Sequence, residues 1–141
     1  IPANTRRYPI ASSAITYSDN NYLYNHENGY DADGSAMNAY IESGGVEIGD
    51  GEQFMFVHRF IPDFEFRGTT ASASMNFTMK GKDFPLNSSS TLATANVTEN
   101  TNQSFIRART RESIIRVESS GTGYGWTLGQ LRFDVRPDGR R

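Results

Sequence analysis

Apolar and polar positions alternate with a period of two in the last third of the chain. Residues 105–111, 113–120 and 125–136 each place apolar side chains next to arginine or an acidic residue. Because successive side chains of a β-strand point to opposite faces, each segment predicts a strand with one buried and one wet face. The expected inward residues are Ile106, Ala108, Ile115, Val117, Leu131, Phe133 and Val135; the expected outward residues are Arg107, Arg109, Arg111, Arg116, Glu118, Arg132, Asp134 and Arg136.

Residues 54–66 carry the cleanest alternation in the sequence. This parity predicts one long strand, or two consecutive ones, with a shared apolar face. Proline cannot donate to a β-ladder, so we expect a bend at Pro62. The parity also places His58 in the core or at a strand edge, which makes it a poor candidate for a zinc ligand. The even positions hold Phe54, Phe56, His58, Phe60, Pro62, Phe64 and Phe66.

Shorter patterns precede and follow this region. Residues 37–42 and 46–48 read as short strands, closed by glycine-rich turns. Residues 71–80 alternate again and predict a longer strand. Its expected inward side chains are Met75, Phe77 and Met79.

Two further segments break the regular pattern. Residues 81–101 are rich in Ser, Thr and Asn, which predicts an exposed excursion with at most a short strand near Leu92. In the last segment Trp126 and Leu128 lie at even positions, whereas the later apolar residues lie at odd ones. Gly129 sits at this slip, where a β-bulge or a sharp bend is the simplest explanation.

These elements predict an all-β fold. Six to eight strands with turns every 8–15 residues, and no helical period, are typical of an antiparallel β-sandwich of the immunoglobulin-like or jelly-roll type. Residues 37–141 would form the sandwich. Residues 1–36 are polar and weakly patterned, and we read them as a linker or the edge of a preceding domain with weak strands. The start at Ile1 suggests a piece of a longer polypeptide.

Composition narrows the chemistry. The 141 residues include no cysteine, which excludes thiolate catalysis and Cys-ligated metal sites and favours synthesis in a reducing cytosol. The two histidines have no third ligand spaced near them, so we expect no metal site and no cofactor. No run of 18 apolar residues is present, so no segment is expected to span a membrane.

Two acidic motifs are candidates for chemistry, and each has a simpler explanation. Asp31 to Asp33 with Gly34 resembles the opening of a calcium loop, and Glu42 lies at the closing position, but the glycine comes too early; we favour a turn. Asp63 and Glu65 share one strand face opposite the phenylalanines, so they are expected to be exposed charges, not a glycosidase pair. We therefore expect no catalytic residues and no enzyme activity.

Charge is unevenly distributed along the chain. Residues 1–66 hold ten acidic and three basic residues, net −7, and residues 67–141 hold six acidic and eleven basic residues, net +5. If the three C-terminal strands pair, their outward arginines would line one face. Guanidinium groups bind carboxylate or phosphate, so this face predicts contact with a neighbouring subunit or with DNA phosphates, unless the arginines only pair with acids on their own sheet. The candidates are Arg107, Arg109, Arg116, Arg132 and Arg136.

The same residues carry a resemblance. Phe-Ile-Arg-Ala-Arg-Thr-Arg at 105–111, Ile-Ile-Arg-Val-Glu-Ser-Ser-Gly at 114–121, Gly-Trp-Thr-Leu-Gly at 125–129 and the arginine-rich stretch at 131–141 resemble the C-terminal end of tail structural proteins of short-tailed bacteriophages. These are the nozzle, tail tubular protein B or DNA stabilisation proteins. The similarity extends over residues 30–141, with residues 40–64 as its earlier part.

The resemblance implies a non-enzymatic virion structural protein. It would be a terminal β domain of a tail subunit, made in the host bacterial cytoplasm and assembled in the virion. Its partners would be copies of itself in a ring, sixfold in such tails, other tail or portal-adaptor proteins, and double-stranded DNA in transit. The alternative is a carbohydrate- or receptor-binding sandwich, for which exposed aromatic rings would supply the stacking platform. The candidates for it are Tyr17, Tyr22, Tyr24 and Tyr30.

Overall fold

The structure, a computed structural model, describes residues 8–13, 21–68 and 72–140. It divides into two compact units, residues 1–30 and residues 31–141. The first unit contains a small antiparallel ribbon of β1 (Ile10–Ser12) and β2 (Leu23–Asn25). All other strands belong to the second unit. The chain thus changes unit a few residues before the position where the sequence pattern places the start of the sandwich.

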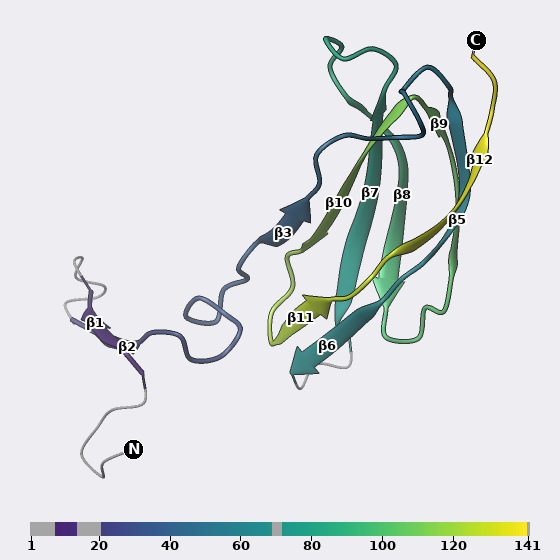
Figure 1. Cartoon of the computed structure of the whole chain (residues 1–141). Helices are drawn as coiled ribbons and strands as arrows, with labels where there is room; N and C mark the ends of the chain where they lie inside the picture. The colour runs from purple at the N-terminus through teal and green to yellow at the C-terminus, as the bar shows by residue number, and fades with distance from the viewer. Residues whose placement is uncertain (1–7, 14–20, 69–71, 141) are drawn as a thin grey trace. The chain divides into compact units, whose positions relative to one another are not determined.

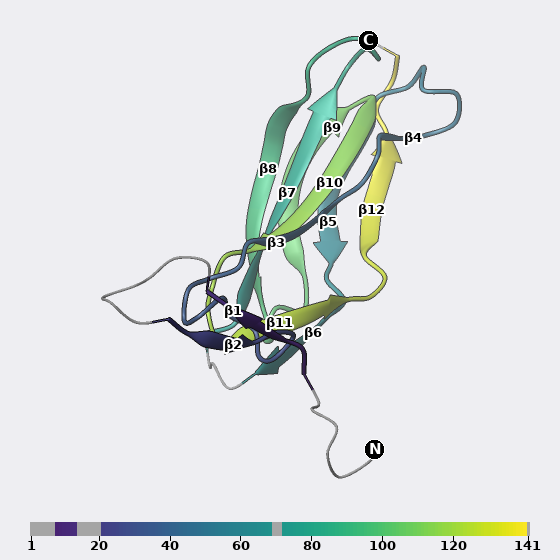
Figure 2. The same ribbon diagram turned by 90° about the vertical axis from the view of Figure 1, so that its left-hand side faces the viewer.

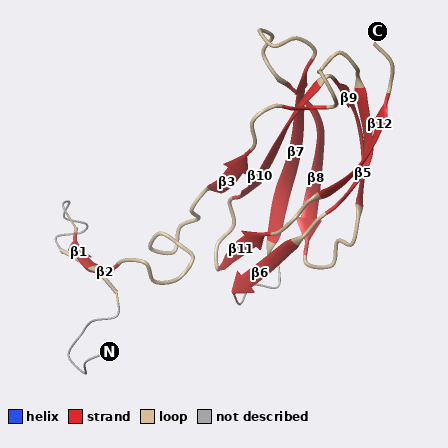
Figure 3. Ribbon diagram, viewed as in Figure 1, coloured by secondary structure: helices blue, strands red, loops and turns tan. Residues whose placement is uncertain are grey.

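The second unit is built from two facing sheets, and the described residues contain no helix (Figures 1 and 3). Figure 2 looks onto the larger sheet, in which β10 pairs with both β3 and β4. The smaller sheet has the order β12-β5-β9, and β6 and β11 form a ribbon at one end of the sandwich. The larger sheet consists of β3 (Ala39–Glu42), β4 (Val46–Glu47), β10 (Glu112–Ser119), β7 (Ser74–Lys82) and β8 (Ser90–Thr98); the others are β5 (Met55–Ile61), β6 (Phe64–Gly68), β9 (Ser104–Thr110), β11 (Tyr124–Leu128) and β12 (Arg132–Pro137).

A phenylalanine and methionine core joins the two sheets. Phe60 in β5 and Phe77 in β7 are fully buried, and their ring centroids lie 4.1 Å apart in a stacked arrangement. The ring of Phe133 in β12 packs against both, with centroid-to-centroid distances of 6.0 Å to each. The all-β sandwich expected from the sequence is therefore confirmed, including the inward orientation of Met75, Phe77 and Met79.

The number of strands exceeds the expected six to eight, since the described residues contain twelve. The main difference is β8, a nine-residue strand in a segment that we expected to be an exposed excursion with at most a short strand near Leu92. Three of its inward residues are small: Ala93 and Ala95 oppose Met79 and Phe77 of β7, and Val97 opposes Met75. Leu92 also packs against the core. Small alanines fit against large neighbours, but they leave little apolar alternation in the sequence.

A register shift at His58 of β5 makes the expected parity wrong in part. The register of β5 shifts between Val57 and Arg59, so Met55 and Val57 are buried before the shift and Phe60 after it. As a result Phe56 and His58 stack on the outer face, with ring centroids 6.4 Å apart. In the pairing with β12 the same shift falls between Asp134 and Val135. Val135 lies opposite the buried Val57, as the parity predicts, but its side chain is 40% exposed instead of buried.

The two bends anticipated near Pro62 and Gly129 form a single corner. β5 ends at Ile61 and β6 begins at Phe64, while β11 ends at Leu128 and β12 begins at Arg132. Asp63 links the two bends, because its carbonyl accepts a hydrogen bond from the Gly129 amide at 2.8 Å and its Oδ2 accepts one from the Gln130 amide at 2.9 Å. The slip at Gly129 is therefore a bend held by Asp63.

Candidate functional site

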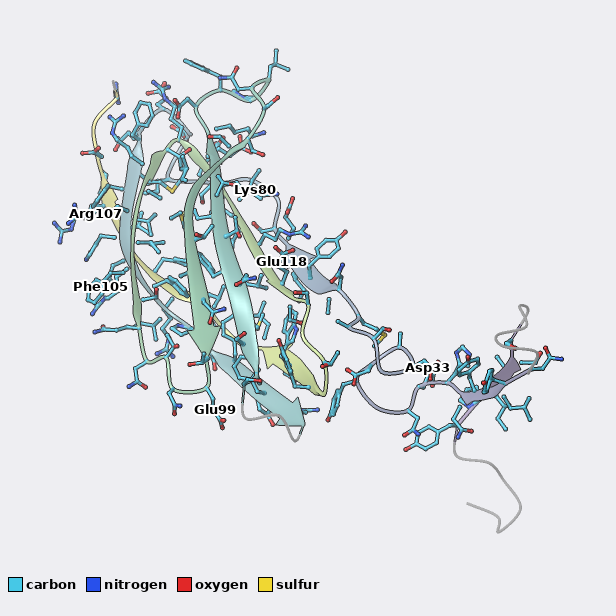
Figure 4. The ribbon with its side chains drawn as sticks, turned by 180° about the vertical axis from the view of Figure 1, so that it is seen from behind. Asp33, Lys80, Glu99, Phe105, Arg107 and Glu118 are labelled. Carbon is cyan, nitrogen blue, oxygen red and sulfur yellow. The ribbon has the colours of Figure 1, made fainter. Side chains whose placement is uncertain are left out.

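The outer face of the three-stranded sheet carries most of the predicted arginines. β9 and β12 lie on either side of β5, so that Arg109 and Arg136 both lie opposite Phe56, and Arg132 lies opposite Ile61. Arg107 projects from the same face of β9, away from the body of the sandwich (Figure 4). We call this face, defined by Arg107, Arg109, Arg132, Arg136 and Phe105, the arginine flank.

Three of its arginines have no acidic partner among the described residues. Arg107, Arg132 and Arg136 are exposed and have no ion-pair partner within the part of the chain that the structure describes. Arg109 differs, because its Nε donates to Asp138 Oδ2 and its guanidinium lies 3.8 Å from the centroid of the Phe54 ring. Within residues 8–13, 21–68 and 72–140, the flank therefore combines one arginine that has structural contacts with three exposed arginines that hold no ion pair.

Apolar surface accompanies these charges. Phe105 precedes Arg107 on the same face of β9, and its side chain is 71% exposed (Figure 4). Between the flanking strands, Arg59 of β5 is bound to Asp134, with an Nε–Oδ2 distance of 2.6 Å. Aromatic and arginine side chains together are enriched where proteins bind proteins, and Lys is not. Phe105 and the unpaired arginines thus form a surface suited to a macromolecular partner.

Arg116 is not part of this flank, which corrects the expectation that all five arginines share one face. β10 pairs with β3 and β7 in the other sheet, not with β9. There Arg116 donates to Glu118 Oε2 at 2.7 Å and to Glu42 Oε2 at 3.2 Å, and its guanidinium lies 4.0 Å from the centroid of the Tyr40 ring. For Arg116, pairing with acids of its own sheet is the correct interpretation.

Glu42 is the shared acceptor of this network. Lys80 Nζ donates to Glu42 Oε2 at 2.8 Å, and this hydrogen bond, followed by the one from Arg116, lowers the pKa of the Glu42 carboxyl below its ordinary value. The bond to Glu118, followed by that to Glu42, raises the pKa of Arg116. The network joins β3, β10 and β7, and its acidic and basic side chains pair with one another. We therefore infer that it stabilises the larger sheet.

Three of the four tyrosines proposed for a carbohydrate- or receptor-binding site lie among the described residues. Tyr17 lies outside the described residues. Tyr22 is 45% exposed and lies 6.3 Å, centroid to centroid, from the half-buried Tyr24. Tyr30 is 40% exposed, and none of the described tyrosines of this group belongs to the core cluster of the sandwich. Two exposed rings therefore remain available for stacking.

The acidic motifs have structural partners. Asp33 and Gly34 form a two-residue turn, with φ of 52° and 77°, between Ala32 and Ser35, whose backbones exchange two hydrogen bonds. Both positive φ values are typical of a type I′ turn, so the turn interpretation is confirmed over the calcium loop. Asp31 Oδ1 accepts from the Gly123 amide at 2.7 Å.

Neither motif gathers ligands or a reactive pair. Asp63 holds the corner described above, and Glu65 pairs with Arg67 at 3.4 Å on an exposed strand face. Across residues 8–13, 21–68 and 72–140, no three His, Asp or Glu side chains come together as a metal-ligand group. No helix in that part of the chain is long and apolar enough to cross a membrane.

One cleft was not anticipated from the sequence. It has a volume of about 190 Å³ and lies between the β4–β5 loop, the β7–β8 loop and the β9–β10 turn. Phe84, on its wall, is 57% exposed, and Leu86 in the same loop is fully exposed. Phe84 and Leu86 stand alone as large apolar residues in a polar segment, so the sequence could have indicated an exposed apolar site in this loop. The acidic residues around them come from separate turns, and the sequence does not show that these turns meet. The lining includes Glu47, Asp50, Asp83, Phe84, Arg111 and Glu112.

Comparison with known proteins adds no family to this description. No protein-family model matches the sequence, and no curated protein matches it.

Proposed function

We propose that this chain is a non-enzymatic structural domain that acts by binding other protein subunits through the arginine flank. The observation that carries the proposal is the set of three exposed arginines without acid partners among the described residues, next to the exposed Phe105. Unpaired arginine forks are suited to carboxylates of a partner, and an exposed aromatic ring supplies the apolar centre that such contacts need.

The assembly we propose is the tail of a short-tailed bacteriophage. The support is the resemblance of residues 105–141 to the C-terminal end of nozzle-type tail proteins. In this chain, residues 105–141 include most of β9 and all of β12, which carry the flank. The domain would contact copies of itself in a ring, sixfold in such tails, around the DNA exit channel. Other tail or portal-adaptor proteins and DNA in transit are further partners of this proposal. The protein would be made in the host bacterial cytoplasm and act in the virion.

A triple variant tests this proposal. Arg107→Ala, Arg132→Ala and Arg136→Ala together, in the gene product that contains this chain, should prevent ring assembly and reduce infectivity without unfolding the domain. The three side chains are exposed and hold no ion pair in the described region, so the fold does not depend on them. Arg116→Ala is the matched control, since its acid partners lie on its own sheet. Normal rings and normal infectivity in the triple variant would rule the proposal out.

A carbohydrate-binding module is the second candidate. The specific observation in its favour is the exposure of Tyr22 and Tyr30, because sugar rings stack on accessible aromatic faces. A glycan-array screen tests it, with a Tyr22→Ala and Tyr30→Ala variant as the control. Binding that the double variant loses would support this candidate, and no binding to any glycan would remove it.

A further inference from the structure

The cleft at the loop end of the sandwich carries acidic side chains, whereas the arginine flank carries basic ones. Glu47, Asp50 and Asp83 are exposed and have no ion-pair partner in the described part of the chain. Glu112 is neutralised by Lys82, with an Nζ–Oε1 distance of 2.9 Å. Arg111 is the one cation on the lining, and its guanidinium lies 5.4 Å from the Phe84 ring centroid. We call Glu47, Asp50, Asp83, Phe84 and Leu86 the acidic pole.

Charge and apolar surface match between pole and flank. As far as the structure describes the chain, the pole offers three carboxylates without ion pairs, and the flank offers three such guanidinium groups in Arg107, Arg132 and Arg136. Each surface also holds an exposed phenylalanine, Phe84 at the pole and Phe105 on the flank. Such complementarity raises association rates and fixes the orientation of partners, while buried aromatic side chains supply affinity at the centre of a contact.

We infer that the acidic pole of one copy binds the arginine flank of the next copy. This inference rests on the proposed function and names the surface that the flank meets on a second copy of the same chain: the acidic pole. Both halves of the contact are present on one molecule, where Asp83 of the pole and Arg109 of the flank line a common pocket. A head-to-tail arrangement of copies makes the contact heterologous, and it closes into a ring or continues as a filament according to the rotation between copies.

Charge reversal tests the inference directly. The pole variant carries Asp50→Lys and Asp83→Lys, and the flank variant carries Arg107→Glu and Arg132→Glu. All four positions are exposed and without ion-pair partners among the described residues, so both variants should unfold at the wild-type temperature. Self-association of the 141-residue chain is followed by sedimentation velocity from about 10 μM to about 1 mM, a range that detects weak contacts.

We expect each variant alone to lose self-association and an equimolar mixture of the two variants to recover it. Each variant alone places like charges against each other and should associate at least about tenfold more weakly than wild type. In an equimolar mixture, the wild-type flank of the pole variant meets the wild-type pole of the flank variant. The two reversed surfaces also match, so alternating assemblies should form.

The other outcomes separate this inference from the proposed function. If the flank variant fails to associate but the pole variant associates like wild type, the flank binds another surface; the inference is wrong and the proposed function stands. If neither variant alters association, the flank is not a subunit contact and both are wrong. A wild-type chain that remains monomeric up to about 1 mM also overturns the inference.

Discussion

Phe60 and Phe77 lie on opposite sheets, and their ring centroids are 4.1 Å apart with the planes 21° from parallel. Both side chains are fully buried, and Phe133 packs against both. This contact is the centre of the core, because it joins the sheet that carries the arginine flank to the sheet that carries the Glu42 network. The position of the flank therefore depends on this pair.

Replacing one ring should destabilise the whole sandwich. We expect Phe77→Ala to lower the free energy of unfolding by roughly 3–5 kcal/mol, since it removes buried apolar surface and leaves a cavity that the sheets cannot close. Urea denaturation measures the change. Phe105→Ala is the matched control, because that ring is 71% exposed, and its effect should be within about 0.5 kcal/mol. Equal losses in the two variants would contradict the assigned core.

The Glu42 network predicts a dependence of stability on pH. The pKa of Glu42 is lowered in the folded state, so its contribution is present above the ordinary value of about 4.5 and is lost as the pH falls through the lower, folded-state pKa. Glu42→Gln should therefore flatten the loss of stability below about pH 4.5. Denaturant unfolding between pH 3 and pH 7, roughly the range over which carboxylates titrate, measures this.

A second carboxylate provides the comparison for Glu42. Glu99 is exposed, and no partner is assigned to it among the described residues. Glu99→Gln should leave the pH profile as in wild type. If Glu42→Gln and Glu99→Gln gave the same profile, the hydrogen bonds from Lys80 and Arg116 would not be stabilising the fold.

Gly68, at the end of β6, is a position where only glycine fits. Its φ is +130°, and a Cβ there would lie 2.3 Å from the Gly123 carbonyl oxygen, a backbone atom of the adjoining strand region. Gly68→Ala should cost roughly 1–3 kcal/mol of stability, from backbone strain and displacement of the β6–β11 ribbon. Thermal unfolding checks this. Gly44→Ala, which meets nothing within 4 Å, should unfold like wild type; a Gly68→Ala protein as stable as that control would refute the strain.

Duplex DNA is a further partner that the flank could hold. Three unpaired arginines that neutralise three phosphates should give weak, sequence-independent binding with a slope of log K against log salt of about −2.7. The variant with alanine at Arg107, Arg132 and Arg136 should show a much flatter slope. Fluorescence anisotropy with a labelled duplex at several salt concentrations measures it. The same slope in wild type and variant would exclude the flank as the DNA contact.

The sequence was sufficient for the elements in which large apolar residues alternate. Met75, Phe77 and Met79 point inward as expected, and the break at Pro62 separates β5 from β6. It was not sufficient where a bulge changes the parity. The shift beside His58 is present in the pairing with both β9 and β12, and no local residue pattern predicts it.

The partners of β10 were the second feature beyond sequence reasoning. Only Arg111 separates β9 from β10, and so short a connection suggests a hairpin. The chain instead crosses from one sheet to the other, and the buried Thr110 hydroxyl lies 3.1 Å and 2.9 Å from the carbonyl oxygens of Lys82 and Glu112. This crossing places Arg116 on a different sheet from Arg107. Which strands pair across a sandwich is a tertiary property, so the composition of the flank required the structure.

Electron microscopy of the gene product that contains this chain would show whether it forms the proposed ring. We expect a closed ring with a channel wide enough for duplex DNA, in which Arg107 and Arg132 of each copy face the neighbouring copy. Monomers or trimers without a channel, or rings in which the arginine flank faces only solvent, would contradict it.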